Sequence, residues 1–304
     1  MSRISMRATI STPAPALRET VGAYVNLLKP HVTVLLLGTT LAAMAVAADG
    51  WPRLGLTLAT LLGGAMAAGS ANALNCYWDR DIDEVMSRTR TRSLPAGRVA
   101  ETPALIFGLA LGVGSVALLA LAVNPLSAAL ALAAILFYVL IYTMWLKRTT
   151  PQNIVIGGAA GAIPVLVGWA AVTNTLAPLP LCMFLIVFMW TPPHFWALSL
   201  LLQKDYARAG VPMLPVVRGE EATRRQILIY AVLLLLTSLL PVVVASGLGR
   251  LYLAGALACG LTLVIFAARL LRARTLAAAR TLFWLSNNYL ALLFALMVLD
   301  RVLR

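Results

Sequence analysis

Asn75, Asp79 and Asp83 are spaced four residues apart at the end of a long apolar stretch. On a helix, this spacing stacks one amide and two carboxylates on a single face, while the intervening Asp81 points elsewhere. The two carboxylates repel each other, and an unpaired carboxylate near lipid costs about 2.5 kcal/mol or more. A divalent cation would remove both costs, and Mg²⁺ is commonly held by one or two carboxylates together with the phosphates of a substrate. The spacing therefore predicts a magnesium site that receives a diphosphate.

The same residues could instead form an ordinary solvated helix end. In this interpretation Arg80 pairs with Glu84 one turn later, and the cluster binds nothing. Features elsewhere in the chain are needed to distinguish the magnesium site from the solvated helix end.

Composition predicts an all-α, polytopic membrane protein. The 304 residues are 61% apolar and 12% charged, with a mean hydropathy of +0.89, which is far too hydrophobic for an ordinary soluble domain. We expect residues 1–30 to form an N-terminal arm and residues 31–304 to form one transmembrane domain. Nine stretches are long enough to span a bilayer, at about 31–49, 54–74, 103–122, 126–145, 154–173, 178–201, 226–246, 251–268 and 283–300.

Basic residues predict the orientation. Of the 24 lysines and arginines, all but Arg53, Arg250, Arg301 and Arg304 fall in the arm or in the loops on its side of the membrane. The positive-inside rule then puts the N-terminus in the cytoplasm and the C-terminus in the periplasm of a bacterial inner membrane. The net charge of +13 follows from these loops and requires no nucleic acid, and it favours anionic lipid and phosphorylated substrates.

Two long charged loops, 75–102 and 202–225, share a sequence pattern. LPAGR at 94–98 matches LPVVR at 214–218, and each follows an aspartate near a predicted helix end. An even number of spans separates the loops, so they would lie on one side of the membrane and face each other across one cavity. We infer a parallel internal repeat; the alternative is chance similarity over five residues.

Basic side chains of these loops are candidates for phosphate binding, because a guanidinium can fork onto phosphate oxygens. For any one of them, the alternative is that it only sets topology. The candidates are Arg88, Arg90, Arg92, Arg98, Lys204, Arg208 and Arg218.

Pro192 and Pro193 precede His194 inside the sixth apolar stretch. Two prolines predict a break or kink whose free backbone groups need protein or cavity partners, which suggests a substrate chamber. His194 and Asp205 would be about 16 Å apart along a continuous helix, so they would serve different depths and not one metal. His194 would contact an acceptor, whereas Asp205 would serve the diphosphate; the alternative is a histidine hydrogen-bonded within the bundle.

Two glycine pairs, Gly108 with Gly112 and Gly157 with Gly161, lie inside apolar stretches. A GxxxG spacing lets helices approach closely, so we expect a packing role and no nucleotide binding. The polar segment from Tyr142 to Asn153 could reach a cavity mouth, or it could only anchor the topology.

Taken together, these motifs resemble the UbiA-type intramembrane prenyltransferase superfamily, and most closely its haem branch. They are NxxxDxxxD at 75–83, MSRTR at 86–90, YTMWLKR at 142–148, TPQNIVIGG at 150–158, WTPPHFW at 190–196 and DYARAGVPMLP at 205–215. The resemblance covers nearly the whole chain and is weakest in the arm and the last three helices. Many members carry two aspartates four apart in a second motif, whereas this chain has His194 early and only Asp205 later, as is typical of the haem branch.

The resemblance implies nine transmembrane helices around a central cavity, and transfer of the farnesyl group of farnesyl diphosphate to a vinyl group of haem B, with water addition, to give haem O. It implies Mg²⁺ on Asn75, Asp79 and Asp83, with Asp205 near a second metal position. Metal and arginines would stabilise the departing diphosphate. The implied partners are farnesyl diphosphate, haem B and membrane lipids, with a terminal oxidase or a haem A synthase using the product.

The resemblance also assigns roles to individual residues. The candidate catalytic residues are Asn75, Asp79, Asp83, Arg88, Arg92, His194 and Asp205. The candidate substrate-binding residues are Arg90, Arg98, Tyr142, Lys147, Arg148, Asn153, Trp190, Lys204, Tyr206, Arg208 and Arg218. By position, Lys147 or Arg148 could hold haem propionates, and His194 could ligate the haem iron.

Three other functions stay open at this point. A transporter would need polar groups on both sides, but nine of the eleven acidic residues fall on the cytoplasmic side. A non-catalytic haem chaperone would not need Asp79 and Asp83. A quinone-type prenyltransferase with an aromatic acceptor would use the same diphosphate site.

Overall fold

The computed structural model describes residues 17–244 and 248–303, so residues 1–16 of the predicted arm lie outside the described residues. Within this part the fold is all-helical, with nine helices long and apolar enough to cross a membrane. These spans are α2 (Pro30–Ala47), α3 (Leu54–Trp78), α5 (Glu101–Ala122), the composite span Pro125–Thr149, α8 (Asn153–Thr173), α9 (Pro178–Leu201), α12 (Gly219–Val244), α13 (Arg250–Ala273) and α14 (Leu276–Val302).

The predicted fold class is therefore confirmed, and most predicted boundaries agree to within a few residues. The seventh and ninth spans begin earlier than predicted, at Gly219 and Leu276, because the polar and charged residues that precede each apolar stretch are also helical. The predicted end of the seventh span, at 246, falls outside the described residues.

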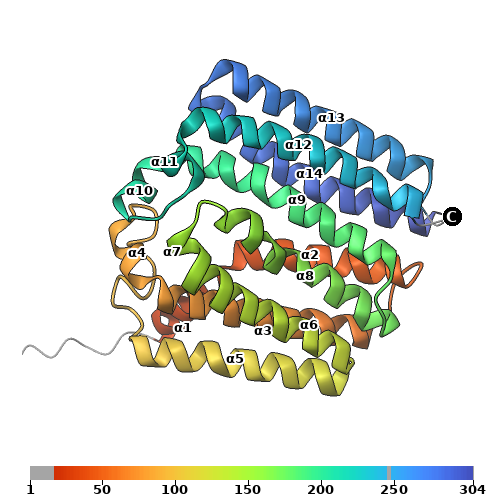
Figure 1. The fold of residues 1–304 in the computed structure, drawn as a ribbon. Coiled ribbons are helices and arrows are strands. Elements are labelled where there is room, and N and C mark those ends of the chain that lie inside the picture. Colours follow the sequence, from red (N-terminus) through yellow and green to blue (C-terminus); the bar gives the residue numbers. More distant parts are fainter. Residues whose placement is uncertain (1–16, 245–247, 304) are drawn as a thin grey trace, which may run out of the picture.

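The spans form two groups joined by a central pair (Figure 1). α3, α5 and α6 (Pro125–Leu136) pack on one side, and α9, α12, α13 and α14 pack on the other. α2 and α8 pack against each other between these groups and contact both of them. Side chains near this central pair therefore face elements from both halves of the chain.

The short helices gather at one end of the bundle (Figure 1). They are α1 (Leu17–Leu27), α4 (Arg80–Val85), α7 (Lys147–Thr149), α10 (Gln203–Arg208) and α11 (Leu214–Val217). The loops 75–102 and 202–225 thus lie at the same end, as predicted, and they touch where Ser87 Oγ donates a hydrogen bond to Asp205 Oδ1 at 3.0 Å. The matching segments differ locally, since 94–98 is a turn whereas 214–217 is helical, and the internal repeat stays a prediction.

Of the break or kink predicted in the sixth span, the break is wrong, because α9 runs from Pro178 to Leu201 without interruption, and the kink stays a prediction. Pro192 and Pro193 lie inside the helix and are buried. The two missing N–H groups cost backbone hydrogen bonds, but α9 packs against α8, α12 and α14, and this packing holds the helix together.

The glycine pairs differ in what they do. A Cβ on Gly108 would lie 2.9 Å from Leu74 Cδ2, which confirms close approach of α5 to α3. A Cβ on Gly157 would lie 2.3 Å from Tyr142 Cδ2, so α8 also needs glycine there. A Cβ on Gly161 would meet nothing within 4 Å, and the packing role predicted for this residue is wrong. Gly161 instead lines an internal cavity.

Candidate active site

Asn75, Asp79 and Asp83 lie on one face, as their spacing predicted. Asn75 is in the last turn of α3, Asp79 joins α3 to α4, and Asp83 is in α4. The hydrogen bonds from Asp79 N to Asn75 O (2.9 Å) and from Asp83 N to Asp79 O (2.8 Å) continue the helical register through the junction. Asp79 is 0% exposed and Asp83 is 2% exposed. The solvated helix end is therefore wrong, and Arg80 pairs with Glu101 (3.0 Å) rather than with Glu84.

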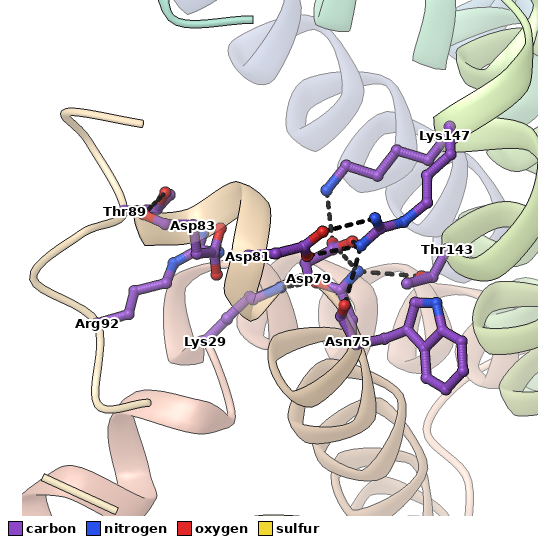
Figure 2. A network of polar contacts seen from close by, with 11 residues as sticks. Lys29, Asn75, Asp79, Asp81, Asp83, Thr89, Arg92, Thr143 and Lys147 are labelled. Atoms are coloured by element: carbon purple, nitrogen blue, oxygen red, sulfur yellow. Dashed lines mark hydrogen bonds and ion pairs between the residues drawn. The ribbon is translucent and has the colours of Figure 1, made fainter. Parts of the chain in front are cut away.

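The Asp79 carboxylate is held by groups from two elements (Figure 2). Lys147 Nζ lies 2.5 Å from Asp79 Oδ2, and Asn75 Nδ2 donates to the same oxygen at 2.7 Å. The other oxygen, Oδ1, lies 3.6 Å from Arg148 Nη2 and accepts no hydrogen bond from the described residues. One buried lone-pair face of Asp79 thus remains to be satisfied.

Asp83 is neutralised separately, by Arg92 of the following loop. Arg92 Nη1 contacts both carboxylate oxygens, at 3.0 and 2.8 Å, while Thr89 Oγ1 donates to the backbone carbonyl of Asp83. The two carboxylates predicted to repel each other are therefore each paired with a cation, as their burial requires.

Lys29 reaches the same cluster, although the sequence indicated only a topological role. Its Nζ donates to Asn75 Oδ1 at 2.6 Å, and Asn72 Nδ2 ties the preceding carbonyl of Leu28 to α3 at 3.0 Å. Lys29 has φ 49° and ψ 64°, a left-handed conformation that is uncommon for a lysine and that clusters at functional sites. Burial lowers the pKa of Lys29. The only sequence signal was a lysine directly before the helix-starting Pro30.

A π-helical segment, Phe137–Leu146, brings the fourth span into the site. Thr143 is fully buried, and its Oγ1 accepts from Asn75 Nδ2 at 3.0 Å, one turn before Lys147. Wide π-turns occur often at functional sites. The segment from Tyr142 to Asn153 therefore reaches the cluster, and Thr143 is a site residue that the sequence interpretation passed over despite its four-residue spacing from Lys147.

Arg148 forms its hydrogen bonds with a different carboxylate from its neighbour Lys147. Its guanidinium forms two 2.8 Å hydrogen bonds with Asp81, which points away from the cluster as predicted. The hydrogen bond from Arg148 lowers the pKa of Asp81 to about 2. Arg148 Nη2 also donates to the carbonyl of Trp78, so it fastens α7 to the end of α3.

Asp205 stands next to this cluster without joining it. Its partners are Ser87 (3.0 Å) and Arg208, whose Nη2 lies 3.4 Å from Oδ1. Within residues 17–244 and 248–303, no three His, Cys, Asp or Glu side chains converge as a metal site. The adjacent Tyr206 is buried, and burial raises the pKa of its hydroxyl.

The remaining basic candidates lie at the surface of this end of the bundle. Arg98 donates to the carbonyl of Thr91. The other exposed side chains are Arg88, Arg90, Lys204, Arg208 and Arg218. The cations that contact the buried cluster most closely are therefore Lys29, Arg92 and Lys147. The sequence alone did not indicate which of the basic residues would do so.

His194 lies in a packed stack between α9 and α14. Its ring stacks on Trp190 (centroids 4.3 Å apart) and on Phe283 (4.7 Å), and its Nδ1 is 2.8 Å from Ser286 Oγ. Trp190 Nε1 donates to the carbonyl of Ser286 at 2.7 Å. This geometry matches the alternative of a histidine hydrogen-bonded within the bundle.

Asn153, another substrate-binding candidate, is fully buried at the start of α8. Its Nδ2 donates to Thr150 O at 2.6 Å, whereas its Oδ1 has no hydrogen-bond partner among the described residues. Asn153 therefore carries an acceptor that a ligand could satisfy.

An apolar cavity begins one helical turn below the cluster and lies between α2, α3, α6 and α8. Two of its polar members, Asn72 and Tyr138, come one turn before Asn75 and Tyr142, and the third is Thr40. Deeper lining residues, including Leu36, Ala68 and Gly161, are small or aliphatic. The arrangement suits a ligand with an anionic head at the cluster and a hydrocarbon chain in the bundle.

The donor set fits Mg²⁺ on chemical grounds. Mg²⁺ is usually held by one or two carboxylates, with phosphate and water oxygens completing an octahedron. Asp79 and Asp83 supply the carboxylates, Asn75 an amide oxygen, and Asp79 Oδ1 is a buried acceptor without a hydrogen bond. The sparse protein shell leaves positions for a diphosphate.

Comparison with known proteins points to one family. The sequence pattern of the UbiA prenyltransferase family matches residues 36–289. A protein named protoheme IX farnesyltransferase from Symbiobacterium thermophilum is 55% identical over 285 residues, which cover 93% of this chain and 95% of that protein. A protein of the same name from Gloeobacter violaceus is 53% identical over 289 residues, which cover 95% of this chain and 94% of that protein. A protein of the same name from Roseiflexus sp. is 53% identical over 92% of this chain, but the match spans only 52%, about half, of that longer relative.

Solved structures agree on the fold. A digeranylgeranylglyceryl phosphate synthase gives a TM-score of 0.77 at 18% identity, covering 94% of this chain and 100% of that one. A UbiA homolog from Archaeoglobus fulgidus, bound to DMAPP and Mg²⁺, gives 0.64 at 16% identity, covering 90% and 99%. With nine spans, a buried NxxxDxxxD cluster and these matches, the chain is a multi-pass membrane protein that belongs to the UbiA prenyltransferase family.

Proposed function

We propose that the protein transfers the farnesyl group of farnesyl diphosphate to a vinyl group of haem B, with addition of water, to give haem O. The observation that carries the proposal is the buried pair Asp79 and Asp83, each neutralised by a cation from another segment, near an apolar cavity whose lining includes Asn72, one helical turn before Asn75. The names of relatives that are about 50 to 55% identical support haem B and the farnesyl group as substrates.

Asn75, Asp79 and Asp83 would hold Mg²⁺ on the diphosphate, and bound Mg²⁺ would neutralise the charge that develops on the leaving group. Lys147 lies within hydrogen-bond distance of Asp79, and Lys29 within hydrogen-bond distance of Asn75. Both ammonium groups can therefore turn to the diphosphate oxygens when the diphosphate binds. Arg92 can do the same from Asp83. The allylic C–O bond then breaks, and the departing electron pair stays on the diphosphate.

The farnesyl chain would lie in the cavity between α2, α3, α6 and α8. Its apolar lining keeps water from the allylic cation, and Tyr138 at the cavity mouth presents a ring that can stabilise positive charge. The vinyl π electrons of haem B form the new C–C bond with this cation. Water then adds to the resulting cation and loses one proton, which gives the hydroxyethylfarnesyl group.

The acceptor roles follow less directly from the contacts. Lys147 and Arg148 are engaged with Asp79 and Asp81, so the hypothesis that they hold haem propionates requires them to exchange partners. His194 presents Nδ1 to Ser286, and a fixed Nδ1 leaves Nε2 as the nitrogen that a haem iron could use. Asp205 is not part of the Asp79 and Asp83 cluster. It would hold a second metal only if the diphosphate reached from that cluster to Asp205.

The protein would lie in the membrane with its active site on the cytoplasmic side. The short helices gather at one end of the bundle (Figure 1), and most basic residues of the sequence fall in the arm and in the loops assigned to the same side, which supports a cytoplasmic N-terminus and active site and a periplasmic C-terminus in a bacterial inner membrane. A terminal oxidase or a haem A synthase would take the product.

The test is product formation by purified protein in detergent with haem B, farnesyl diphosphate and Mg²⁺, followed by mass spectrometry. Wild type should give haem O, and Asp79→Asn and Asp83→Asn should lower turnover by at least a hundredfold. Asp81→Asn is the matched control, because it removes an aspartate of the same segment that faces outward, and it should retain most activity. Haem binding without product in any variant would favour a chaperone, and prenylation of a phenolic acceptor instead of haem would favour a quinone-type enzyme.

A further inference from the structure

A second pocket opens at the same end of the bundle, at the junction of α1 and α2. Its polar lining consists of Asn26, Lys29, His31 and Arg92, and we call these four residues the outer basic pocket. Gly22, Val25, Pro30 and Val32 complete the lining. Three side chains that can carry positive charge thus converge where α1 turns into the first span.

Donor groups of this pocket remain available to a ligand. The hydrogen bonds that Arg92 makes to Asp83 both come from Nη1, so its other guanidinium nitrogens are not committed to that carboxylate. Lys29 has three donor positions on Nζ, and its hydrogen bond to Asn75 uses one of them. Asn26 accepts a 3.3 Å hydrogen bond from Ser93 and keeps its amide group as a donor. Such a set of donors recognises phosphate oxygens.

The pocket adjoins the apolar cavity at Val32, which lines both. α1 also presents Leu17, Val21 and Val25 as exposed apolar side chains, at 81%, 54% and 45%. With these side chains in the membrane interface, as is typical of an amphipathic helix, the outer basic pocket would lie at the level of the lipid headgroups. A ligand with an anionic head and a hydrocarbon chain would therefore meet donors at one end and the cavity at the other.

We propose that the outer basic pocket binds the phosphate head of a membrane amphiphile, and that its occupant is the prenyl diphosphate before it reaches the aspartates. This proposal rests on the proposed function for the identity of the substrate. The head would bind Lys29, His31 and Arg92 without a metal, and its chain would pass Val32 toward the cavity. An anionic phospholipid has the same phosphate chemistry and is the other possible source.

The test is metal-free binding, which needs no turnover. Farnesyl diphosphate would be titrated calorimetrically into full-length protein in detergent with EDTA, so that metal-dependent binding at the aspartates does not contribute. Lys29→Ala should raise the dissociation constant about tenfold, as for a lost charge-assisted hydrogen bond, and His31→Ala should raise it severalfold. Arg18→Ala removes an exposed positive charge from α1 outside the pocket and should change nothing.

His31 is exposed and makes no part of the buried cluster, so His31→Ala tests the pocket even if Lys29→Ala weakens folding. A parallel arm measures retention of phosphatidylglycerol by native mass spectrometry. If only this retention depends on His31 and Lys29, the phosphate site stands and its occupant is a phospholipid rather than the substrate. If neither ligand responds to either substitution, the proposal is overturned, whatever the haem O assay shows.

Discussion

Lys147 and Asp79, 68 residues apart in the chain, form an ion pair at 2.5 Å in which the carboxylate side chain is 1% exposed. The pair joins the end of the fourth span to the junction between α3 and α4. A lysine at this distance occupies the space around Asp79 Oδ2 that a divalent cation would use. Protein cations thus neutralise the two buried aspartates. A divalent cation on Oδ2 would have to displace Lys147, whereas Oδ1 accepts no hydrogen bond from the described residues.

The first prediction concerns this pair. Lys147→Ala leaves the buried Asp79 carboxylate with the Asn75 amide at 2.7 Å and, as its cation, only the more distant Arg148 at 3.6 Å, so we expect the unfolding free energy to fall by about 3 kcal/mol in metal-free detergent. Adding Mg²⁺ should recover more stability in the variant than in wild type, because Mg²⁺ no longer competes with Lys147. Thermal unfolding with EDTA and with Mg²⁺ measures both effects.

Lys204→Ala serves as the control for Lys147, because it removes an exposed lysine from the same end of the bundle. It should change the unfolding free energy by less than about 0.5 kcal/mol. An equal Mg²⁺ response in wild type and in Lys147→Ala would show that lysine and metal do not compete for Asp79.

The second prediction concerns pH. The hydrogen bond from Arg148 lowers the pKa of Asp81 to about 2, below the 3.8 of a free aspartate. A depressed folded-state pKa stabilises the protein above the unfolded-state pKa, and this stabilisation is lost as pH falls from about 4 to 2. Wild type should therefore be slightly more stable than Asp81→Asn at pH 7, by less than about 1 kcal/mol because Asp81 is exposed, and the difference should vanish near pH 2.

Melting temperatures of the two proteins between pH 7 and pH 2.5 test this prediction, provided that unfolding stays reversible. Glu84→Gln, an exposed acid in the same helix, is the control and should show no such convergence. A constant difference between wild type and Asp81→Asn across this range would rule out the assignment to the Arg148 pair.

The sequence predicted the spans well because bilayer thickness and apolar length constrain each other directly. It also predicted the shared face of Asn75, Asp79 and Asp83, since the helical register runs through the α3–α4 junction. The contacts of Lys29 and Thr143 could not be predicted in this way. They depend on the left-handed turn before α2 and on the π-helical segment, two backbone features that hydrophobic periodicity does not encode.

The absence of a break at Pro192 and Pro193 has a similar origin. Local propensity disfavours helix there, whereas packing of α9 against three neighbours in the bundle keeps it helical. The internal repeat and the pairing of each aspartate with its own cation likewise depend on tertiary contacts. The sequence offered seven basic loop residues as equal candidates for phosphate binding. Only the partial burial of Arg92 beside Asp83 in the structure distinguishes it from the other six.

The third prediction compares two glycines one turn apart in α8. A Cβ on Gly157 would lie 2.3 Å from the ring of Tyr142, so Gly157→Ala should destabilise the protein by about 1 to 3 kcal/mol. Gly161→Ala meets nothing within 4 Å and should leave stability unchanged or raise it by about 0.5 to 1 kcal/mol. Unfolding of both variants in one detergent measures the contrast. Equal losses would mean that helix packing, and not the neighbour of each glycine, governs the pair.

The fourth prediction concerns the length of the prenyl chain. Gly161 lines the apolar cavity, so a larger side chain there would take space from the ligand without touching the ion pairs near Asp79. Gly161→Leu should lower kcat/KM for farnesyl diphosphate at least tenfold relative to geranyl diphosphate, while Gly161→Ala should shift this ratio only slightly. Competition between the two diphosphates, read by mass spectrometry of the products, measures the ratio directly. If both substrates lose activity equally, the chain does not extend as far as Gly161, and the hydrocarbon must lie elsewhere in the bundle.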